Sequence, residues 1–185
     1  AEPVKVVLLG ESGVGKSSII SQFTAHKFNQ RCPTSVSAQF ISKKVDFPEL
    51  GQSIKFDIWD TVGQERYRSL AKIFYKDAKV VIFVYDITTK HSLQGLKDYW
   101  YEENINNNNL NPILVVVANK IDLYLEQEVE NSEGQAYADE IGAIFQTTSA
   151  LSDSGITTLF ENIGKKYLIP DFDYKRIDKS DQEEY

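Results

Sequence analysis

The sequence has few of the residues that mark secreted, membrane-spanning or metal-clustered proteins. Cys32 is the only cysteine, so neither an intrachain disulfide nor a metal site built from several cysteines is available, and a reducing compartment is the simpler interpretation. The longest apolar runs, Val80–Tyr85 and Ile113–Ala118, are six residues each, whereas a transmembrane helix requires about 18 or more. Methionine is absent even from position 1 and no signal peptide is recognisable, so we expect that the natural N-terminus has been trimmed or replaced.

A basic charge balance is also missing. The chain has 27 acidic and 20 basic residues and a formal net charge of −7. A general nucleic-acid binder would show a basic patch or stripe, so we expect no nucleic-acid partner. A nucleotide ligand remains compatible, because a few N–H groups and one lysine can bind phosphate in an acidic protein. The 185 residues, 42% of them hydrophobic, suffice for one domain with a substantial core.

Short β-rich runs alternate with segments of helical periodicity. We predict six strands, at Val4–Leu9, Gln39–Asp46, Ser53–Trp59, Val80–Tyr85, Ile113–Ala118 and Ile144–Thr147. The turn signal PELG at 48–51 joins two of them as an antiparallel hairpin. We predict helices at Lys16–Ala25, around Leu93, Leu96 and Trp100, at about Ser132–Ile141, and along the apolar stripe Ile156, Leu159, Phe160, Ile163 and Tyr167. The alternation indicates an α/β fold: a doubly wound, mostly parallel six-stranded sheet with one antiparallel edge strand and helices on both faces.

Two segments carry little of this pattern. Residues 104–111 are rich in asparagine, and we predict a surface loop there. Residues 171–185 are acidic and poor in apolar side chains, so we expect a C-terminal tail or linker after a single domain spanning residues 1–170.

In a doubly wound sheet, ligands bind at the carboxyl ends of the strands. Residues 10–17 follow the first predicted strand, read GESGVGKS and fit the pattern G-x-x-x-x-G-K-[ST] immediately before a helix. The glycines permit a loop whose N–H groups point at one phosphate chain, and the helix N-terminus adds partial positive charge. Lys16 would reach the β- and γ-phosphates, and the hydroxyl of Ser17 would bind Mg²⁺.

Two further motifs follow later strands. Residues 60–65 read DTVGQE; Asp60 suits a role in holding the metal, the N–H of Gly63 would approach a γ-phosphate, and Gln64 would orient an attacking water. Residues 119–122 read NKID. Asp122 would accept two N–H donors from guanine, which adenine does not offer on one edge.

Neighbouring residues complete the expected base site. Lys120 would lie along the base and Asn119 would tie loops together. The sequence Thr148-Ser149-Ala150 follows the last predicted strand, where the N–H of Ala150 would meet the guanine O6.

These elements, in this order over about Val4–Leu168, resemble the Ras-like small GTPases and most of all the Rab branch, on the segments KFDIWDTVG, ERYRSL and VYDIT. The resemblance implies a P-loop G domain that hydrolyses GTP and acts as a switch in vesicle trafficking. It implies phosphate contacts from Gly10, Ser12, Gly13, Val14, Gly15, Lys16, Ser17, Ser18 and Gly63, with Gln64, Lys16 and Gly63 catalytic. It also implies guanine contacts from Phe28, Asn119, Lys120, Asp122, Leu123, Ser149, Ala150 and Leu151, magnesium held by Ser17, Ser35 and Asp60, and an effector-binding aromatic triad of Phe40, Trp59 and Phe74. For these three aromatic residues, plain core packing is the alternative.

The sequence departs from that family in several places. Ser35 stands where a threonine normally binds Mg²⁺; we favour Ser35 over the adjacent Thr34 for that role. Ser37 replaces a glycine and restricts the first switch. Val62 adds bulk beside the γ-phosphate, and Leu151 replaces a lysine that would stack on the base.

Several functional alternatives remain open at this stage. Arg31 is a solvated loop charge or, less favoured, an arginine finger acting in cis. The chain as a whole is a GTPase, an ATP-dependent P-loop enzyme, or a GTP-binding scaffold with negligible turnover. The NKID motif speaks against the second, and the departures at positions 35, 37 and 62 keep the third open.

The resemblance also implies partners and a location. We expect a monomer that meets exchange factors, GTPase-activating proteins and effectors on the cytosolic face of an endomembrane, and we expect that membrane to be endosomal. Rab proteins usually end in prenylated cysteines, and no cysteine follows Cys32. Either the chain was cut before a lipid anchor or the protein departs from the family in this respect, and we favour the first.

Overall fold

The computed structural model describes residues 2–26, 39–61 and 72–173. Its strands are β1 (Val4–Leu9), β2 (Gln39–Phe47), β3 (Gln52–Asp60), β4 (Val80–Asp86), β5 (Ile113–Asn119) and β6 (Ile144–Thr147). They form one sheet in the order β2-β3-β1-β4-β5-β6. Only β2, at one edge, is antiparallel to its neighbour, so the predicted fold class is confirmed, and each predicted strand is correct to within one residue at either end.

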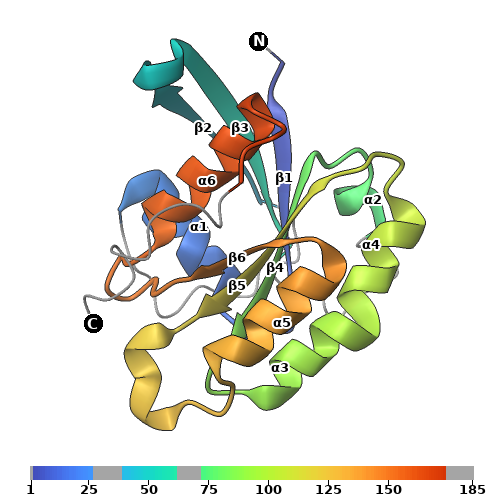
Figure 1. The fold of residues 1–185 in the computed structure, drawn as a ribbon, viewed down its shortest axis with the longest axis vertical. Coiled ribbons are helices and arrows are strands. Elements are labelled where there is room, and N and C mark those ends of the chain that lie inside the picture. The colour runs from blue at the N-terminus through green and yellow to red at the C-terminus, as the bar shows by residue number, and fades with distance from the viewer. Residues whose placement is uncertain (1, 27–38, 62–71, 174–185) are drawn as a thin grey trace.

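The helices cover both faces of the sheet (Figure 1). Helices α1 (Lys16–Ala25) and α6 (Ile156–Leu168) pack on one face, where a core cluster includes Ile19, Phe23 and Phe160. Helices α2 (Lys72–Tyr75), α3 (Lys90–Gly95), α4 (Tyr101–Asn107) and α5 (Asn131–Ile141) cover the other. All seven residues of β4 are buried because helices cover both of its faces, as its continuous apolar sequence indicates.

One predicted helix is divided in the structure. The residues around Leu93, Leu96 and Trp100 form α3, then a π-helical turn over Leu96–Trp100, then α4. A π turn inserts an extra residue and re-aims the side chains that follow it. Leu96 and Trp100 are both buried there, so apolar packing accompanies the turn.

The predicted surface loop over residues 104–111 is wrong in its first half. Asn104 to Asn107 continue α4, and the helix ends at Asn108, whose φ of −105° and ψ of 123° are extended. Asn104 is only 1% exposed, and Asn108 donates from Nδ2 to the carbonyl oxygen of Ala78 at 3.1 Å. These tertiary contacts outweigh the weak helix propensity of asparagine.

Candidate nucleotide-binding site

The loop between β1 and α1 has a conformation that only glycine accommodates easily. Gly15 caps α1 with a φ of +103°, and a Cβ atom there would stand 2.3 Å from Nδ2 of Asn119. A Cβ on Gly10 would stand 2.3 Å from the carbonyl oxygen of Val84. The loop is therefore pressed between neighbouring strand ends, with its backbone close to the position of any ligand.

The start of α1 concentrates positive charge beside this loop. The helix has no side-chain cap at Gly15 and no acidic residue in its first turn, and the positive end of its dipole faces this loop. Lys16 is 3% exposed, and its Nζ donates to the carbonyl oxygens of Gly10 at 2.7 Å and Glu11 at 3.0 Å. The ammonium group thus lies over the loop rather than in solvent.

Ser17 and Asp60 meet across the sheet. The Oγ of Ser17 donates to Oδ2 of Asp60 at 2.6 Å, although 43 residues separate them. Asp60 is paired with Leu8 in the parallel register of β1 and β3, which brings it to the phosphate loop. Thr61 donates to the carbonyl oxygen of Leu8 at 2.6 Å and holds the chain as it leaves the strand.

This pair is suited to magnesium. Among the residues that the structure describes, no group of three or more His, Cys, Asp or Glu side chains is placed to hold a metal. Mg²⁺ commonly binds one or two carboxylates together with phosphate oxygens and water, so a single carboxylate beside a phosphate loop matches its preference.

The NKID segment is joined to the phosphate loop. Nδ2 of Asn119 donates to the carbonyl oxygen of Val14 at 2.9 Å, and Oδ1 accepts from the hydroxyl of Thr148 at 2.9 Å. The prediction that Asn119 ties loops together is confirmed by these two bonds. Lys120 has a φ of +69° and donates from Nζ to the carbonyl oxygen of Gly13 at 2.7 Å. These hydrogen bonds thereby join three loops: the phosphate loop, the NKID segment and the loop that contains Thr148.

Asp122 is oriented from the next loop. Its Oδ1 accepts from the hydroxyl of Ser149 at 2.7 Å. Ala150 is buried, and its carbonyl oxygen accepts from Nε2 of Gln22 on α1 at 2.6 Å. Leu123 and Leu151 are 37% and 55% exposed, so they are available to flank a ligand.

The sequence analysis assigned no role to two residues that the structure brings to this site. Asp86, at the end of β4, is aligned with Asn119 and accepts from Nζ of Lys120 at 2.9 Å; its place at a strand end was the available signal. Gly95 of α3 lies against the phosphate loop, since a Cβ there would stand 2.4 Å from Oε1 of Glu11. A lone glycine inside a helical pattern gives no such indication.

The three predicted effector aromatics form a continuous row. Ring centroids of Phe40 and Trp59 lie 5.1 Å apart, and those of Trp59 and Phe74 6.0 Å apart. Phe40 is 49% exposed while Phe74 is buried. The row therefore begins at the surface, which plain core packing of all three rings does not explain.

Several predicted residues lie outside the described ranges: Phe28, Arg31, Thr34, Ser35, Gly63 and Gln64. Their roles remain predictions. Among the described helices, none combines the length and the apolarity needed to cross a bilayer.

Comparison with known proteins agrees with this geometry. The Ras family model matches residues 5–169. The chain is 40% identical to the Ras-related protein Rab-21 of Homo sapiens over 164 residues, which is 89% of this chain and 72% of that protein. It is 38% identical to RabJ of Dictyostelium discoideum, over 89% of this chain and 63% of that protein, and 38% identical to Rab-5A of the same organism, over 88% and 79%.

These matches favour a GTPase over an ATP-dependent enzyme or an inactive scaffold. With a mostly parallel six-stranded sheet, a phosphate loop and an NKID segment joined to it, the chain belongs to the Ras family and, within it, to the Rab-like GTPases that act in vesicle trafficking.

Proposed function

We propose that the cleft at the carboxyl ends of β1, β3 and β5 binds GTP and GDP, and that the residues assigned from the sequence are those that hold the nucleotide. The observation that carries this proposal is the bond from Asn119 to the carbonyl oxygen of Val14, at 2.9 Å. It holds the candidate base-reading loop at a set distance from the phosphate loop, and one ligand with a base at one end and phosphates at the other spans both.

The phosphates of the nucleotide are bound by Lys16, by the side chains of Ser17 and Ser18, and by the backbone of residues 10–18. Lys16 already places its ammonium group over the loop at Gly10 and Glu11, so its charge lies where phosphate oxygens arrive. Ser12, Gly13 and Val14 supply backbone N–H groups, and Gly63 supplies another from the DTVGQE motif.

Ser17 and Asp60 are the proposed magnesium residues, together with Ser35 in preference to Thr34. When bound, Mg²⁺ neutralises charge on the β- and γ-phosphates. The 2.6 Å hydrogen bond between Ser17 and Asp60 supports this choice, because it brings the two oxygen atoms side by side. The hydroxyl of Ser17 and the carboxylate of Asp60 would hold the ion.

Asp122 is the proposed guanine reader. A carboxylate accepts from N1–H and from the exocyclic amine of guanine, and adenine leaves one of its oxygens unpaired. The bond from Ser149 holds the carboxylate in one orientation before the base arrives. Asn119, Lys120, Leu123, Ser149, Ala150 and Leu151 complete the base site, with Phe28 against its edge.

For hydrolysis, Gln64 orients a water in line with the γ-phosphate, because an amide has no pKa suited to a strong base. Lys16 and the N–H of Gly63 stabilise the charge that develops on the transferred group. By analogy with related enzymes we expect an intrinsic rate on the order of 10⁻⁴ to 10⁻² s⁻¹. Gln64→Leu should hold the protein in its GTP form, and normal single-turnover hydrolysis by that variant contradicts the role.

Competition between nucleotides tests the base site. Labelled GDP should be displaced by GTP and not by ATP at the same concentration. Asp122→Asn should lower GTP affinity on the order of 100-fold, because a donor then faces the guanine donors. Glu126→Gln, an exposed acid four residues further on, is the matched control and should leave affinity unchanged. Displacement by ATP, or an equal loss in both variants, overturns the assignment.

The switch carries out its role through partners. We propose that exchange factors and GTPase-activating proteins act at the nucleotide cleft, and that effectors bind the row formed by Phe40, Trp59 and Phe74. We further propose action as a monomer on the cytosolic face of an endosomal membrane, through a lipid anchor beyond this chain. Its relatives Rab-21 and Rab-5A support that choice of compartment.

A further inference from the structure

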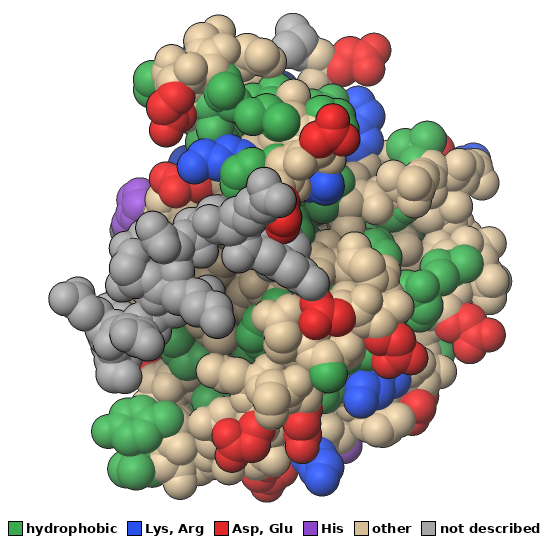
Figure 2. Space-filling model, viewed as in Figure 1, with side chains coloured by type: hydrophobic (Ala, Val, Ile, Leu, Met, Phe, Trp, Pro, Cys, Tyr) green, Lys and Arg blue, Asp and Glu red, His purple; other side chains and the backbone are tan. Residues whose placement is uncertain are grey.

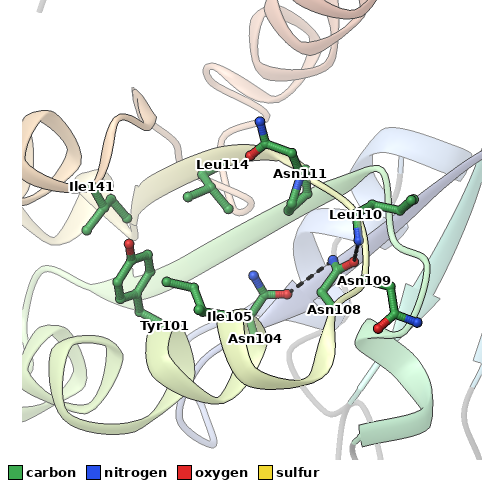
Figure 3. Close-up of a pocket in the computed structure, with 10 residues that line it drawn as sticks. Tyr101, Asn104, Ile105, Asn108, Asn109, Leu110, Asn111, Leu114 and Ile141 are labelled. Atoms are coloured by element: carbon green, nitrogen blue, oxygen red, sulfur yellow. Dashed lines mark hydrogen bonds between the residues drawn. The ribbon is translucent and has the colours of Figure 1, made fainter.

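A hollow lies away from the phosphate loop, at the end of α4. Its volume is about 440 Å³, within the range of ligand-binding pockets. Figure 3 shows Tyr101, Asn104 and Ile105 on α4, Leu114 on β5 and Ile141 at the end of α5, with the 108–111 connection beside them. The hollow lies at the N-terminal end of β5, whereas the proposed nucleotide site lies at the C-terminal end of that strand.

The chemistry of the lining is unusual for this chain. Charged residues make up 25% of the sequence, yet none of the described residues that line the pocket is charged. The lining consists of Tyr101, Asn104, Ile105, Asn108, Asn109, Leu110, Asn111, Pro112, Leu114 and Ile141. Acidic side chains are prominent around α5 on the face seen in Figure 2. An uncharged hollow in an acidic molecule selects an uncharged ligand, because a charged group would lose its hydration there without a partner.

Two kinds of group alternate around the hollow. Ile105 and Leu110 are 52% and 44% exposed, so apolar surface is left open to solvent beside Leu114. Asparagine side chains lie between these apolar groups, and each carries a carbonyl acceptor and an N–H₂ donor. A peptide main chain offers the same two groups in alternation with its side chains.

The rim of the pocket is already organised. Asn108 donates to the carbonyl oxygen of Ala78 at 3.1 Å and to Oδ1 of Asn104 at 3.4 Å, and its own Oδ1 accepts from the backbone N–H of Leu110 at 2.9 Å. The last two of these bonds are drawn in Figure 3. A preformed rim lowers the ordering cost that binding would otherwise carry.

We propose that this pocket binds an extended, uncharged segment of a partner protein. One aliphatic side chain of that segment lies between Ile105 and Leu114, and the amides of Asn109 and Asn111, both exposed, hydrogen-bond to its main chain. The site is independent of the nucleotide cleft and is occupied together with it.

The test uses the GDP-loaded protein and a blocked tripeptide, acetyl-alanyl-leucyl-alanine methylamide, followed by the NMR shifts of backbone and asparagine amides. We expect saturable shifts confined to residues 101–114 and 141, with a Kd on the order of 1 mM for so small a ligand. The same peptide with aspartate in the central position should bind at least about tenfold more weakly. Equal binding of the two peptides, or shifts outside this region, overturns the proposal.

Surface variants locate the contact. Ile105→Ser should weaken the tripeptide about tenfold, as loss of a buried aliphatic contact predicts, and Ile169→Ser, at another exposed isoleucine, should not. Asn111→Asp should weaken it, and Asn106→Asp, on α4 but outside the pocket, should not. Both pairs change exposed residues, so folding is preserved. If both members of a pair behave alike, the pocket is not the site.

Isoamyl alcohol separates a peptide site from a simple apolar cavity, because it carries the leucine side chain without amides. It should bind at least about tenfold more weakly than the tripeptide if the asparagines hold a main chain. Equal affinity overturns the main-chain contacts and assigns the hollow to small apolar ligands.

Discussion

The hydroxyl of Ser17 lies 2.6 Å from a carboxylate oxygen of Asp60, and this contact joins the first turn of α1 to the end of β3. Neither residue is near the other in sequence. The parallel register of β1 and β3 brings them together, since Leu8, just before the phosphate loop, pairs with Asp60.

Removing this hydroxyl should weaken magnesium-dependent binding. We expect Ser17→Ala to lower GTP affinity on the order of 100-fold in Mg²⁺, and far less in EDTA, because a metal ligand rather than a phosphate contact is lost. Ser42→Ala is the matched control, since Ser42 makes the same kind of bond to Asp57 at 2.7 Å on the exposed hairpin. Titration of a fluorescent GTP analogue measures both; equal loss in EDTA excludes a metal role.

Gly15 should not tolerate a side chain. Its φ is +103° and a Cβ would meet Nδ2 of Asn119, so Gly15→Ala should push the NKID loop away from the phosphate loop. We expect nucleotide affinity to fall on the order of 100-fold. Gly51→Ala shares the positive φ, at +61°, but has open space around it, so it should cost stability alone. Nucleotide dissociation rates distinguish the two; unchanged release from Gly15→Ala contradicts the clamp.

The ion pair between Lys120 and Asp86 should stabilise the fold before any nucleotide binds. The Asp86 side chain is 8% exposed and its oxygens accept from Lys120 and from Thr88. Lys120→Met should lower the free energy of unfolding by about 2 kcal/mol, because a buried carboxylate loses its counter-ion. Lys44→Met breaks an exposed pair with Asp46 and should change it by less than about 0.5 kcal/mol.

Urea unfolding with and without GDP separates two contributions of Lys120. The loss without nucleotide reports the pair with Asp86, and any additional loss with GDP reports contact with the base. If Lys120→Met and Lys44→Met are equally stable without GDP, the pair of Lys120 and Asp86 contributes nothing to the free energy of unfolding.

Tyr85 should make stability fall in alkaline solution. Burial, with a smaller effect from Glu133, raises the pKa of its phenol above the ordinary value of 10.0, so the folded protein keeps a proton that the unfolded chain releases. The contribution of Tyr85 to the free energy of unfolding is therefore fully present below pH 10 and declines as the pH rises above 10. Unfolding in urea at pH 8 and pH 11 should show the decline, and Tyr85→Phe should reduce it.

At pH 8, Tyr85→Phe should also raise the free energy of unfolding, on the order of 1 kcal/mol, because the buried hydroxyl of Tyr85 has no hydrogen-bond partner among the residues that the structure describes. Tyr137→Phe is the control, since that hydroxyl donates to the carbonyl oxygen of Leu96 at 3.5 Å. If Tyr85→Phe destabilises the protein more than Tyr137→Phe does, the Tyr85 hydroxyl has a partner in solution.

Local patterns in the sequence determined the elements and the chemistry of the loops. The buried run of β4, the helical stripe of α6 and the GESGVGKS loop each depend on residues close together in the chain. Backbone conformation and apolar periodicity are short-range properties, so such segments can be predicted from the sequence alone.

The tertiary structure alone decided which of those parts meet. The bond from Asn119 to Val14 joins residues 105 positions apart, and the pairing of Lys120 with Asp86 follows from strand order. The helix through Asn104 and the pocket beside it likewise depend on packing against distant strands, which overrode the local preference of asparagine for loops. Contacts between distant segments are set by how buried surfaces fit together, and no short-range pattern encodes that fit.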